Sequence, residues 1–348
     1  MDKICRLNYI GSKFQLLEWI TENIKCKTGL SDFNGKVVAD LFAGTGVVSH
    51  HFRKNGAIVV SNDAELYSSV VTHAFTCSEY TSNCETILNL LQQELDQDKH
   101  ENFVGFVTTH YSPYETSERM FFTTSNARKI DYLRNRLEQL TFNEVNDYYY
   151  ILACIIIAAD SVSNVPAVYG CYLKKFKSKA TKPLVLKPIH TNKTRNDNVT
   201  YNKDVLDKQF IQSITADIVY LDPPYNERQY SKNYFPLNII AKQPLELLSE
   251  KPLKGKTGIP SDCFISPFCR RSTVEQAFEH LFKSLNAKWI FVSYNSESIV
   301  SREKMCNLMN KYGTCTVLEC DYKRFKSFEY NNDKQIKEYL FCLKVNDS

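Results

Sequence analysis

A strand, a glycine turn, a helix and a second strand are expected directly after one another near the beginning of the chain. Residues 36–42 and 57–61 are short apolar runs that contain pairs of valines, and a Gly-Thr-Gly turn at 44–46 follows the first run. A helix from this turn through Lys54 joins two such strands in parallel, as in a βαβ unit. Parallel strands joined in this way form an open α/β sheet, which binds ligands beyond the carboxyl ends of its strands. The sequence therefore predicts an α/β fold with its functional site at that edge.

Further strands are expected in the second half of the chain. Residues 217–221, 289–294, 314–320 and 337–343 are apolar runs of strand length. No helical pattern separates the last two runs, so we expect them to form an antiparallel pair at one edge of the sheet. Apolar residues at helical spacing predict an amphipathic helix over residues 13–23.

The middle of the chain, residues 76–195, lacks this alternation of strands and helices. Helices are expected over residues 127–140 and 147–162. Because 348 residues exceed one typical domain, we interpret 1–75 and 196–348 as one α/β domain that carries 76–195 as a largely helical insert.

Positive charge is concentrated in two segments, although the net charge of the chain is only +4. Residues 174–203 contain nine lysines and arginines and one acid, Asp197, with aromatic residues between them. This excess favours contact with nucleic-acid phosphates over a solvated lysine-rich loop. The phosphate contacts expected here are Lys174, Lys175, Lys177 and Lys179. For a second stretch, residues 251–271 with Arg270 and Arg271, both interpretations stay open.

The twelve cysteines are scattered along the chain without a Cys-x-x-Cys pair. Scattered thiols, with no apolar leader over residues 1–6, favour a reducing, cytoplasmic location over a disulfide framework. We expect no metal, because structural zinc sites need closely spaced ligands. The longest apolar run, residues 148–159, predicts a buried helix, because a membrane span needs about 20 residues.

Asp222-Pro223-Pro224-Tyr225 directly follows the expected strand 217–221. The two prolines make a rigid turn without backbone N–H donors of its own. The Asp222 carboxylate and the Pro223 carbonyl can each accept one N–H of a planar exocyclic amine, and Tyr225 offers a face to its ring. An aspartate with the ordinary pKa of about 3.9 is ionised at neutral pH and only accepts hydrogen bonds. This motif predicts an amine-binding catalytic site, and a solvated turn at the strand's end is the alternative.

Residues 40–46, Asp-Leu-Phe-Ala-Gly-Thr-Gly, form the expected strand-to-helix turn. Glycines at such a turn let a ligand approach the backbone, although a plain turn has the same pattern. Asp63 ends the next strand, where an acid can accept both hydroxyls of a ribose. Ser49 stands where a dinucleotide fingerprint has its third glycine. The pattern therefore favours a smaller nucleoside, such as S-adenosylmethionine, over a pyrophosphate cofactor.

The segment Tyr-Ile-Gly-Ser-Lys at residues 9–13 is, by itself, a turn before a helix, in which Ser12 can act as the cap and Lys13 can point at an anionic ligand. Three motifs, however, follow one another along the chain at residues 9–13, 42–46 and 222–225. In these motifs and in their order, the chain resembles the Dam-like (alpha-class, D12) DNA adenine-N6 methyltransferases of bacterial restriction–modification systems. The resemblance covers nearly the whole chain. Further matching segments are residues 229–231, 293–295 and 322–327.

The resemblance implies an S-adenosylmethionine-dependent enzyme with a Rossmann-like sheet and a target-recognition region, which here falls at residues 76–195. The catalytic residues that it implies are Asp222, Pro223, Pro224 and Tyr225. The cofactor-binding residues that it implies are Tyr9, Lys13, Asp40, Phe42, Ala43, Gly44, Thr45, Gly46, Asp63 and Asp204. The long helical middle region departs from the compact recognition region of the smallest members, so no DNA contacts are carried over to it.

The implied reaction begins when an adenine is flipped out of double-stranded DNA and stacks on Tyr225, with Tyr230 as a second candidate for contact with DNA. Asp222 and the Pro223 carbonyl then hold its amine opposite the sulfonium methyl. This is catalysis by position and electrostatics, without a metal or a covalent intermediate.

Several alternatives remain at this point. An RNA adenine-N6 or a DNA cytosine-N4 methyltransferase can use the same strip, although cytosine-N4 enzymes more often resemble Ser-Pro-Pro-Tyr. A nicotinamide-dependent oxidoreductase is a further alternative, but that function does not explain the Pro-Pro-Tyr strip. An inactive nucleic-acid-binding protein is another, but an intact catalytic strip argues against it. We expect a monomer without membrane contact that protects host DNA beside a cognate restriction endonuclease, a partner in function and not necessarily in contact.

Overall fold

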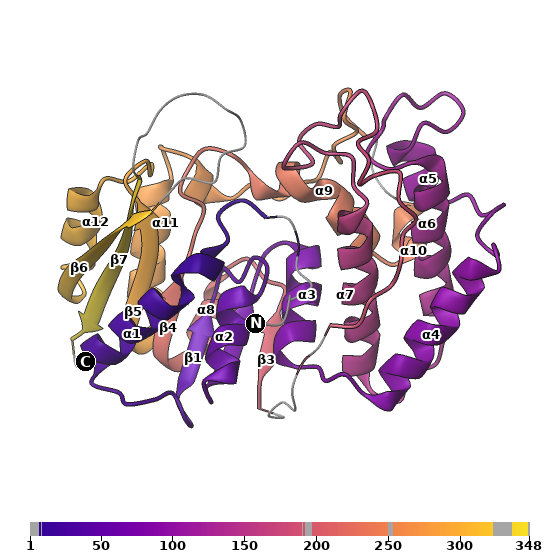
Figure 1. The fold of residues 1–348 in the computed structure, drawn as a ribbon. Helices are drawn as coiled ribbons and strands as arrows, with labels where there is room; N and C mark the ends of the chain where they lie inside the picture. Colours follow the sequence, from indigo (N-terminus) through magenta and orange to yellow (C-terminus); the bar gives the residue numbers. More distant parts are fainter. Residues whose placement is uncertain are drawn as a thin grey trace. The chain divides into compact units, whose positions relative to one another are not determined.

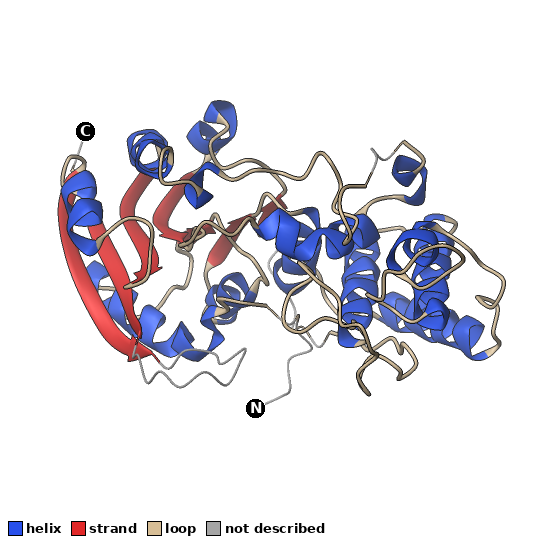
Figure 2. Cartoon of the chain, turned by 90° about the horizontal axis from the view of Figure 1, so that it is seen from above, coloured by secondary structure: helices blue, strands red, loops and turns tan. Residues whose placement is uncertain are grey.

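The computed structural model describes residues 7, 9–189, 191, 197–249, 253–322 and 336–346. The chain forms two compact units, and each combines segments that are distant in the sequence (Figure 1). The sheet unit contains Ser12–Ala64, Arg195–Gln229 and Ile265–Ser348, and the helical unit contains Met1–Gly11, Glu65–Thr194 and Tyr230–Phe264. Figure 2 shows that the described strands all belong to the sheet unit.

The described part of the sheet unit has one seven-stranded sheet in the order β3-β2-β1-β4-β5-β7-β6. The strands are β1 Val37–Asp40, β2 Ile58–Asn62, β3 Val199–Tyr201, β4 Thr215–Leu221, β5 Asn286–Asn295, β6 Gly313–Tyr322 and β7 Ile336–Val345. The first five are parallel to their neighbours in this order, whereas β7 is antiparallel to both β5 and β6. Because β7 runs in the opposite direction, its first residues lie at the edge where β4 and β5 end.

Helices cover both faces of the sheet, because successive side chains of a strand point to opposite faces and both sets are apolar. The face with Tyr220 and Leu340 packs against α1 and α2, and the face with Leu221 and Phe341 packs against α8, α11 and α12. The bounds are α1 Leu17–Thr28, α2 Val47–Lys54, α8 Lys208–Ser213, α11 Val274–Ser284 and α12 Arg302–Met309. Asp222, two residues after Tyr220, continues the series that faces α1 and α2.

The helical unit is built around its own helix α7. This helix is buried from Tyr150 through Asp160 and packs against α3, α4, α6 and α9. The helices are α3 Leu66–Thr76, α4 Ser82–Asp96, α5 Phe106–Tyr111, α6 Thr124–Glu138, α7 Val145–Ser161, α9 Tyr230–Ala241 and α10 Pro244–Leu247. Thr81 and Thr123 cap α4 and α6 by accepting backbone N–H bonds, as short hydroxyl side chains do at helix starts. No helix among the described residues is long and apolar enough to cross a membrane.

The expected α/β sheet with an antiparallel edge and a largely helical insert is confirmed. Four helices and six of the strands lie where the sequence pattern predicts them, within a few residues. The short strand β3 was not expected. The helical unit also extends beyond residues 76–195, because it takes in α3, α9 and the segment after α9. The division of the chain into a catalytic domain and a target-recognition region stays a prediction of function.

Candidate active site

The candidate site lies at the edge where the parallel strands end. β1 and β4 are neighbours in the sheet, with Asp40 in register with Tyr220, and the Leu41 N–H donates to the Tyr220 carbonyl at 3.3 Å. The glycine turn follows β1 and Asp222 follows β4. The sheet therefore brings the two most informative motifs together, although they are far apart in the sequence.

The glycine turn has a backbone that favours glycine. Gly44 has a φ of 55° and Gly46 a φ of 74°, in the left-handed region that side chains with a Cβ rarely adopt. Gly46 directly precedes α2, and its N–H donates to the Ala43 carbonyl at 2.8 Å. Thr45 is buried within the turn. Because Gly44 and Gly46 have no side chains of their own, a ligand can approach the backbone of the turn and the start of α2.

Two further acids lie at the ends of neighbouring parallel strands. Asp63 follows β2, and its Oδ2 accepts the Gly44 N–H at 2.7 Å, which ties the acid to the glycine turn. Asp204 follows β3, where it is exposed and its Oδ1 accepts the Leu206 N–H at 2.9 Å. Because β3 pairs with β2 in parallel, both acids lie at the same edge as the turn.

Asp40 is almost fully buried at the end of β1. Its Oδ2 accepts the Ser49 hydroxyl at 2.6 Å, and Ser49 in turn accepts the Ser61 hydroxyl at 3.0 Å. The Phe42 backbone N–H faces the same carboxylate, yet Oδ1 is buried without a hydrogen bond of ordinary geometry in the described part of the chain. Burial raises the pKa of Asp40 to about 7, although the Ser49 hydroxyl lowers it. Ser49 therefore has a partner that the motif pattern did not reveal.

Lys13 and Asp222 form an ion pair in which Lys13 is buried and Asp222 is partly exposed. The Lys13 Nζ lies 3.0 Å from Asp222 Oδ1 and 3.8 Å from Glu338 Oε2, and the side chains of Lys13 and Glu338 are less than one-tenth exposed. Lys13 is the first residue of the short 3₁₀ helix Lys13–Leu16 that leads into α1. The Ser12 side chain makes no capping bond, so the capping prediction is wrong. The sequence pattern gave Lys13 an anionic partner, and in the structure that partner is the candidate catalytic carboxylate.

These charges shift one another's pKa values. Burial raises the pKa of Asp222, and Lys13 opposes this increase through its charge and hydrogen bond. Burial lowers the pKa of Lys13, but Asp222 and Glu338 together more than reverse that effect, so its pKa is raised and it stays charged. Burial also raises the pKa of Glu338. The ordinary aspartate assumed from the sequence is therefore not what the fold provides at position 222.

The rest of the Asp-Pro-Pro-Tyr strip is held against the sheet unit. Pro223 is buried, Pro224 and Tyr225 are half-buried, and the Tyr225 carbonyl accepts the Ile299 N–H at 3.0 Å. Phe42 is also half-buried and packs edge-on against Phe268, with ring centroids 5.1 Å apart. Aromatic side chains therefore remain partly accessible near the carboxylates.

The composition of this edge fits S-adenosylmethionine. Four carboxylates, those of Asp40, Asp63, Asp222 and Glu338, are accompanied by one ammonium group, that of Lys13. Such a site attracts a cationic sulfonium and repels a pyrophosphate. The buried, unbonded Asp40 Oδ1 is an acceptor of the kind that a cofactor or its water can satisfy.

Tyr9 and Tyr230, which the sequence pattern also pointed to, belong to the helical unit. Their rings lie 5.5 Å apart, and Tyr9 stacks on Tyr234 at 5.0 Å. The Tyr234 hydroxyl accepts the Ile10 N–H at 2.9 Å, so this tyrosine cluster holds the segment before Lys13 against α9. In the structure the two residues therefore pack against each other within the helical unit.

The four lysines expected to contact phosphates differ in their surroundings. Lys174 and Lys175 are exposed. The Lys177 ammonium donates a hydrogen bond to the Val165 carbonyl, and the Lys179 ammonium donates one to the Asp160 carbonyl at 3.4 Å. The last two side chains thus already support the loop after α7, and the first two are the better placed for contact with DNA.

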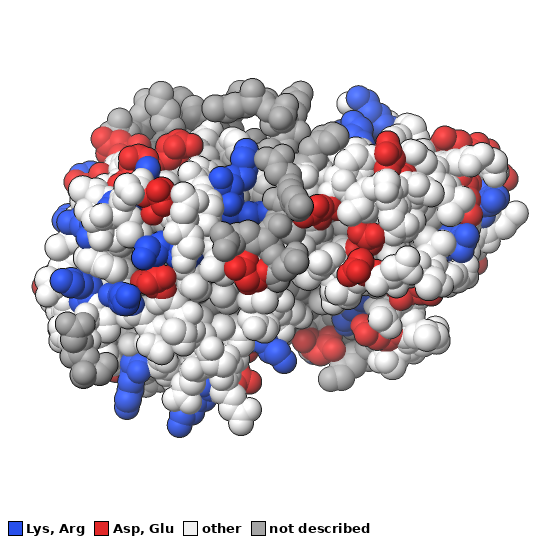
Figure 3. Space-filling model, turned by 90° about the horizontal axis from the view of Figure 1, so that it is seen from below, with Lys and Arg blue, Asp and Glu red and all other residues white. Residues whose placement is uncertain are grey.

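Arg270 and Arg271 are exposed on the sheet unit, and Arg271 Nε lies 3.3 Å from Glu227 Oε1. Figure 3 shows basic and acidic side chains interspersed over the described part of one face.

Of the additional family-like segments, 323–327 lies outside the described residues. No group of three or more metal-binding side chains is present among the described residues.

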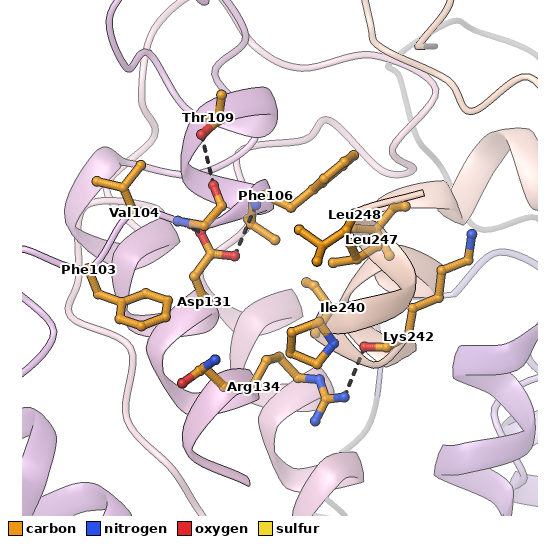
Figure 4. Close-up of a pocket in the computed structure, with 15 residues that line it drawn as sticks. Phe103, Val104, Phe106, Thr109, Asp131, Arg134, Ile240, Lys242, Leu247 and Leu248 are labelled. Atoms are coloured by element: carbon orange, nitrogen blue, oxygen red, sulfur yellow. Dashed lines mark hydrogen bonds between the residues drawn. The ribbon is translucent and has the colours of Figure 1, made fainter. Parts of the chain in front are cut away.

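A pocket of about 300 Å³ lies in the helical unit, between the start of α5, α6 and residues 239–248 (Figure 4). Two of its charged side chains make hydrogen bonds within the helical unit. Asp131 accepts backbone N–H bonds that include those of Gly105 and Thr108, and Arg134 donates to the Lys242 carbonyl. None of the residues expected from the sequence to bind or react lines this pocket, so it is separate from the candidate active site.

Comparisons with known proteins show the family of the chain. Residues 9–308 match the D12 class N6 adenine-specific DNA methyltransferases. The chain is 38% identical to the type II methyltransferase M.CviAII of Paramecium bursaria Chlorella virus 1, over 98% of this chain and 99% of that protein. It is 37% identical to M.NlaIII of Neisseria lactamica, over 94% of each. It is 33% identical to M.FokI of Planomicrobium okeanokoites, over 97% of this chain and 52% of that longer protein.

Proposed function

Because this chain belongs to the D12 class N6 adenine-specific DNA methyltransferases, we propose that its methyl-transfer site is the Asp222–Tyr225 strip beside the glycine turn at residues 44–46. The main observation is that β1 and β4 are neighbours, which puts the partly exposed Asp222 carboxylate next to a backbone turn that a nucleoside can approach. S-adenosyl-L-methionine is the cofactor, and when bound it supplies an electrophilic methyl group on a sulfonium.

The glycine turn and the acids around it hold the cofactor. Asp63 lies against the turn through Gly44 and accepts the ribose hydroxyls. Asp204, at the end of the next strand, accepts from the adenine of the cofactor. Asp40 lies behind the turn, where its carboxylate accepts the Ser49 hydroxyl, and the ionised form of Asp40 favours the cationic part of the ligand. Lys13 does not contact the cofactor in this scheme, because its ammonium is bound by Asp222.

Asp222 and the Pro223 carbonyl bind the amine of the target adenine. The lone pair of this amine is delocalised into the ring, which makes it a poor nucleophile. Two acceptors on its N–H groups favour a tetrahedral nitrogen and direct the lone pair at the methyl group. Tyr225 stacks on the flipped base and partly offsets the few kcal/mol that extrusion costs. Asp222 has to be ionised for this role, and the Lys13 ammonium favours the ionised form.

The biological context that we propose is that of the type II relatives. The enzyme methylates a specific double-stranded DNA sequence in the cytoplasm and protects it from a cognate restriction endonuclease that need not bind it. It acts as a monomer, because each event modifies one strand. Lys174 and Lys175 contribute phosphate contacts from the helical unit, which serves in target recognition.

The experiment that tests this proposal is expression of the chain in a host that lacks DNA methylation, followed by sequencing with detection of modified bases. We expect N6-methyladenine at one short recurring sequence, and none with Asp222→Ala. Methylated cytosine in DNA, or methylation found only in RNA, would refute the assignment of the substrate.

A further inference from the structure

Glu338 is a buried acid within an otherwise apolar strand series. It lies near the start of β7, on the inward-facing side with Ile336 and Leu340, and is only 6% exposed. A buried carboxylate is costly unless it is paired, and its Oε2 has no hydrogen bond in the described part of the chain. The methyl-transfer scheme above makes no use of this group, so its position calls for an explanation.

The antiparallel direction of β7 brings Glu338 to the active edge. It is in register with Asn295, the last residue of β5, and its Oε2 lies 3.8 Å from the Lys13 Nζ. The groups that face it are Lys13 from the 3₁₀ helix, Tyr220 on β4, Asp222 and Tyr225 after β4, Asn295 on β5 and Cys320 on β6. One ammonium is therefore shared between two carboxylates, with Asp222 holding it at 3.0 Å and Glu338 at the longer distance.

This sharing affects the acceptor capacity of Asp222. In the absence of substrate, Lys13 occupies one oxygen of the Asp222 carboxylate. Oδ2 can still accept from an incoming amine, but the ammonium on Oδ1 draws on the charge of the same carboxylate and so weakens the bond from Asp222 to the amine. If Lys13 can move toward a second carboxylate, Asp222 is released without leaving an unpaired buried ammonium. Glu338 is a buried acid within reach of such a movement.

We propose that Glu338 is a positioning residue that takes over the Lys13 ammonium when Asp222 binds the target amine. The inference rests on the proposed function, since it assigns a helper to the same carboxylate. Glu338 touches neither the base nor the methyl group in this scheme, and it acts only through Lys13. The alternative is a purely structural role, in which Glu338 anchors the 3₁₀ helix on β7. The test has to distinguish this role from the proposed one.

The test compares wild type with Glu338→Gln, which keeps the shape and removes the charge. We expect the single-turnover rate of methyl transfer at saturating cofactor and DNA to fall about 10- to 100-fold. Dissociation constants for S-adenosylmethionine and DNA should stay within about threefold, because the residue acts after binding. The matched control is Glu319→Gln on β6, which also removes a carboxylate from an ion pair with a lysine but is exposed, and it should keep the wild-type rate.

The second arm is a double-mutant cycle with Lys13→Met. If Glu338 acts through Lys13, Glu338→Gln should change the rate of Lys13→Met by less than about twofold. Three outcomes would overturn the proposal: a Glu338→Gln rate within twofold of wild type, an undiminished effect in the Lys13→Met background, or loss of cofactor binding in Glu338→Gln. Failure of the proposed function is separate, because it would appear as a wild-type enzyme that transfers no methyl group to adenine.

Discussion

The Lys13 ammonium and the Asp222 carboxylate form an ion pair at 3.0 Å, although 208 positions in the chain lie between them. The pair joins the segment before the first helix to the end of β4. This strand and β2, which Asp63 follows, lie on opposite sides of β1. The Lys13 charge opposes the increase in the pKa of Asp222 that burial causes. The predictions below follow from this pair and from its surroundings.

The methyl-transfer rate should decrease toward acidic pH, and this decrease should occur at a higher pH than the ordinary pKa of aspartate would give. Asp222 has to be ionised to accept from the amine, and burial raises its pKa, so activity increases as pH rises through that pKa and is lost below it. Lys13→Met removes the opposing charge and should move this limb to still higher pH. Single-turnover rates between pH 5 and 9 test this, and an unmoved limb in Lys13→Met would contradict it.

The stability of the free protein should depend on Asp40. Its pKa is about 7 in the fold and 3.8 when unperturbed, so the stabilisation present at low pH is lost as pH rises through 7. Relative to wild type, Asp40→Asn should therefore gain up to about 4 kcal/mol in unfolding free energy between pH 4 and 8. Urea unfolding at both pH values measures this difference. Exposed Asp262→Asn is the control, and an equal pH dependence of Asp40→Asn and wild type would exclude the predicted pKa.

Asp63→Asn should weaken cofactor binding more than catalysis. The substitution removes a charged acceptor that is tied to the Gly44 N–H and is proposed to bind the ribose. Hydrogen bonds to charged groups contribute about 1.5–3 kcal/mol, so the dissociation constant of S-adenosylmethionine should rise about 10- to 150-fold. Calorimetric titration gives this constant. The rate at saturating cofactor should stay near wild type, and a large loss there with unchanged affinity would assign Asp63 another role.

Two matched pairs of lysines should behave differently in DNA binding. Lys174 and Lys175 are exposed, so replacing both by glutamine should lower the slope of log Kd against log salt by about 2. Lys177 and Lys179 donate to carbonyls of their own unit, so the same replacement there should reduce thermal stability and change the slope less. Fluorescence anisotropy over a salt series compares the pairs. Equal slopes for both variants would contradict the distinction.

The sequence predicted those features that depend on local pattern. Apolar runs of strand length and helical spacing indicated six strands and the central helices, because burial on one or both faces imposes those periods. β3 was not predicted because it is only three residues long and its pairing with β2 is formed by tertiary structure. The composition of the sequence does not change at α3 or at α9, so it does not assign these helices to the helical unit. Their membership of that unit follows from tertiary packing.

The same limit applies to the candidate site. Asp222, Asp63 and the glycine turn were found because each follows a strand and has a recognisable motif. Glu338 was not, since an isolated acid in a strand has no motif and gains its meaning only from Lys13, which reaches it in the folded chain. Ser49 was noted only as a missing glycine, although it hydrogen-bonds Asp40 in the fold.

Incubation of the wild-type enzyme and of Asp222→Asn with duplex DNA and isotopically labelled S-adenosylmethionine, followed by digestion to nucleosides and mass spectrometry, tests the role of Asp222 most directly. The wild type should yield labelled N6-methyladenine. Asp222→Asn should lose at least about 100-fold in rate while it still binds the cofactor, because it lacks the charge that holds the amine. Label on another base, or an Asp222→Asn rate close to that of the wild type, would contradict the account.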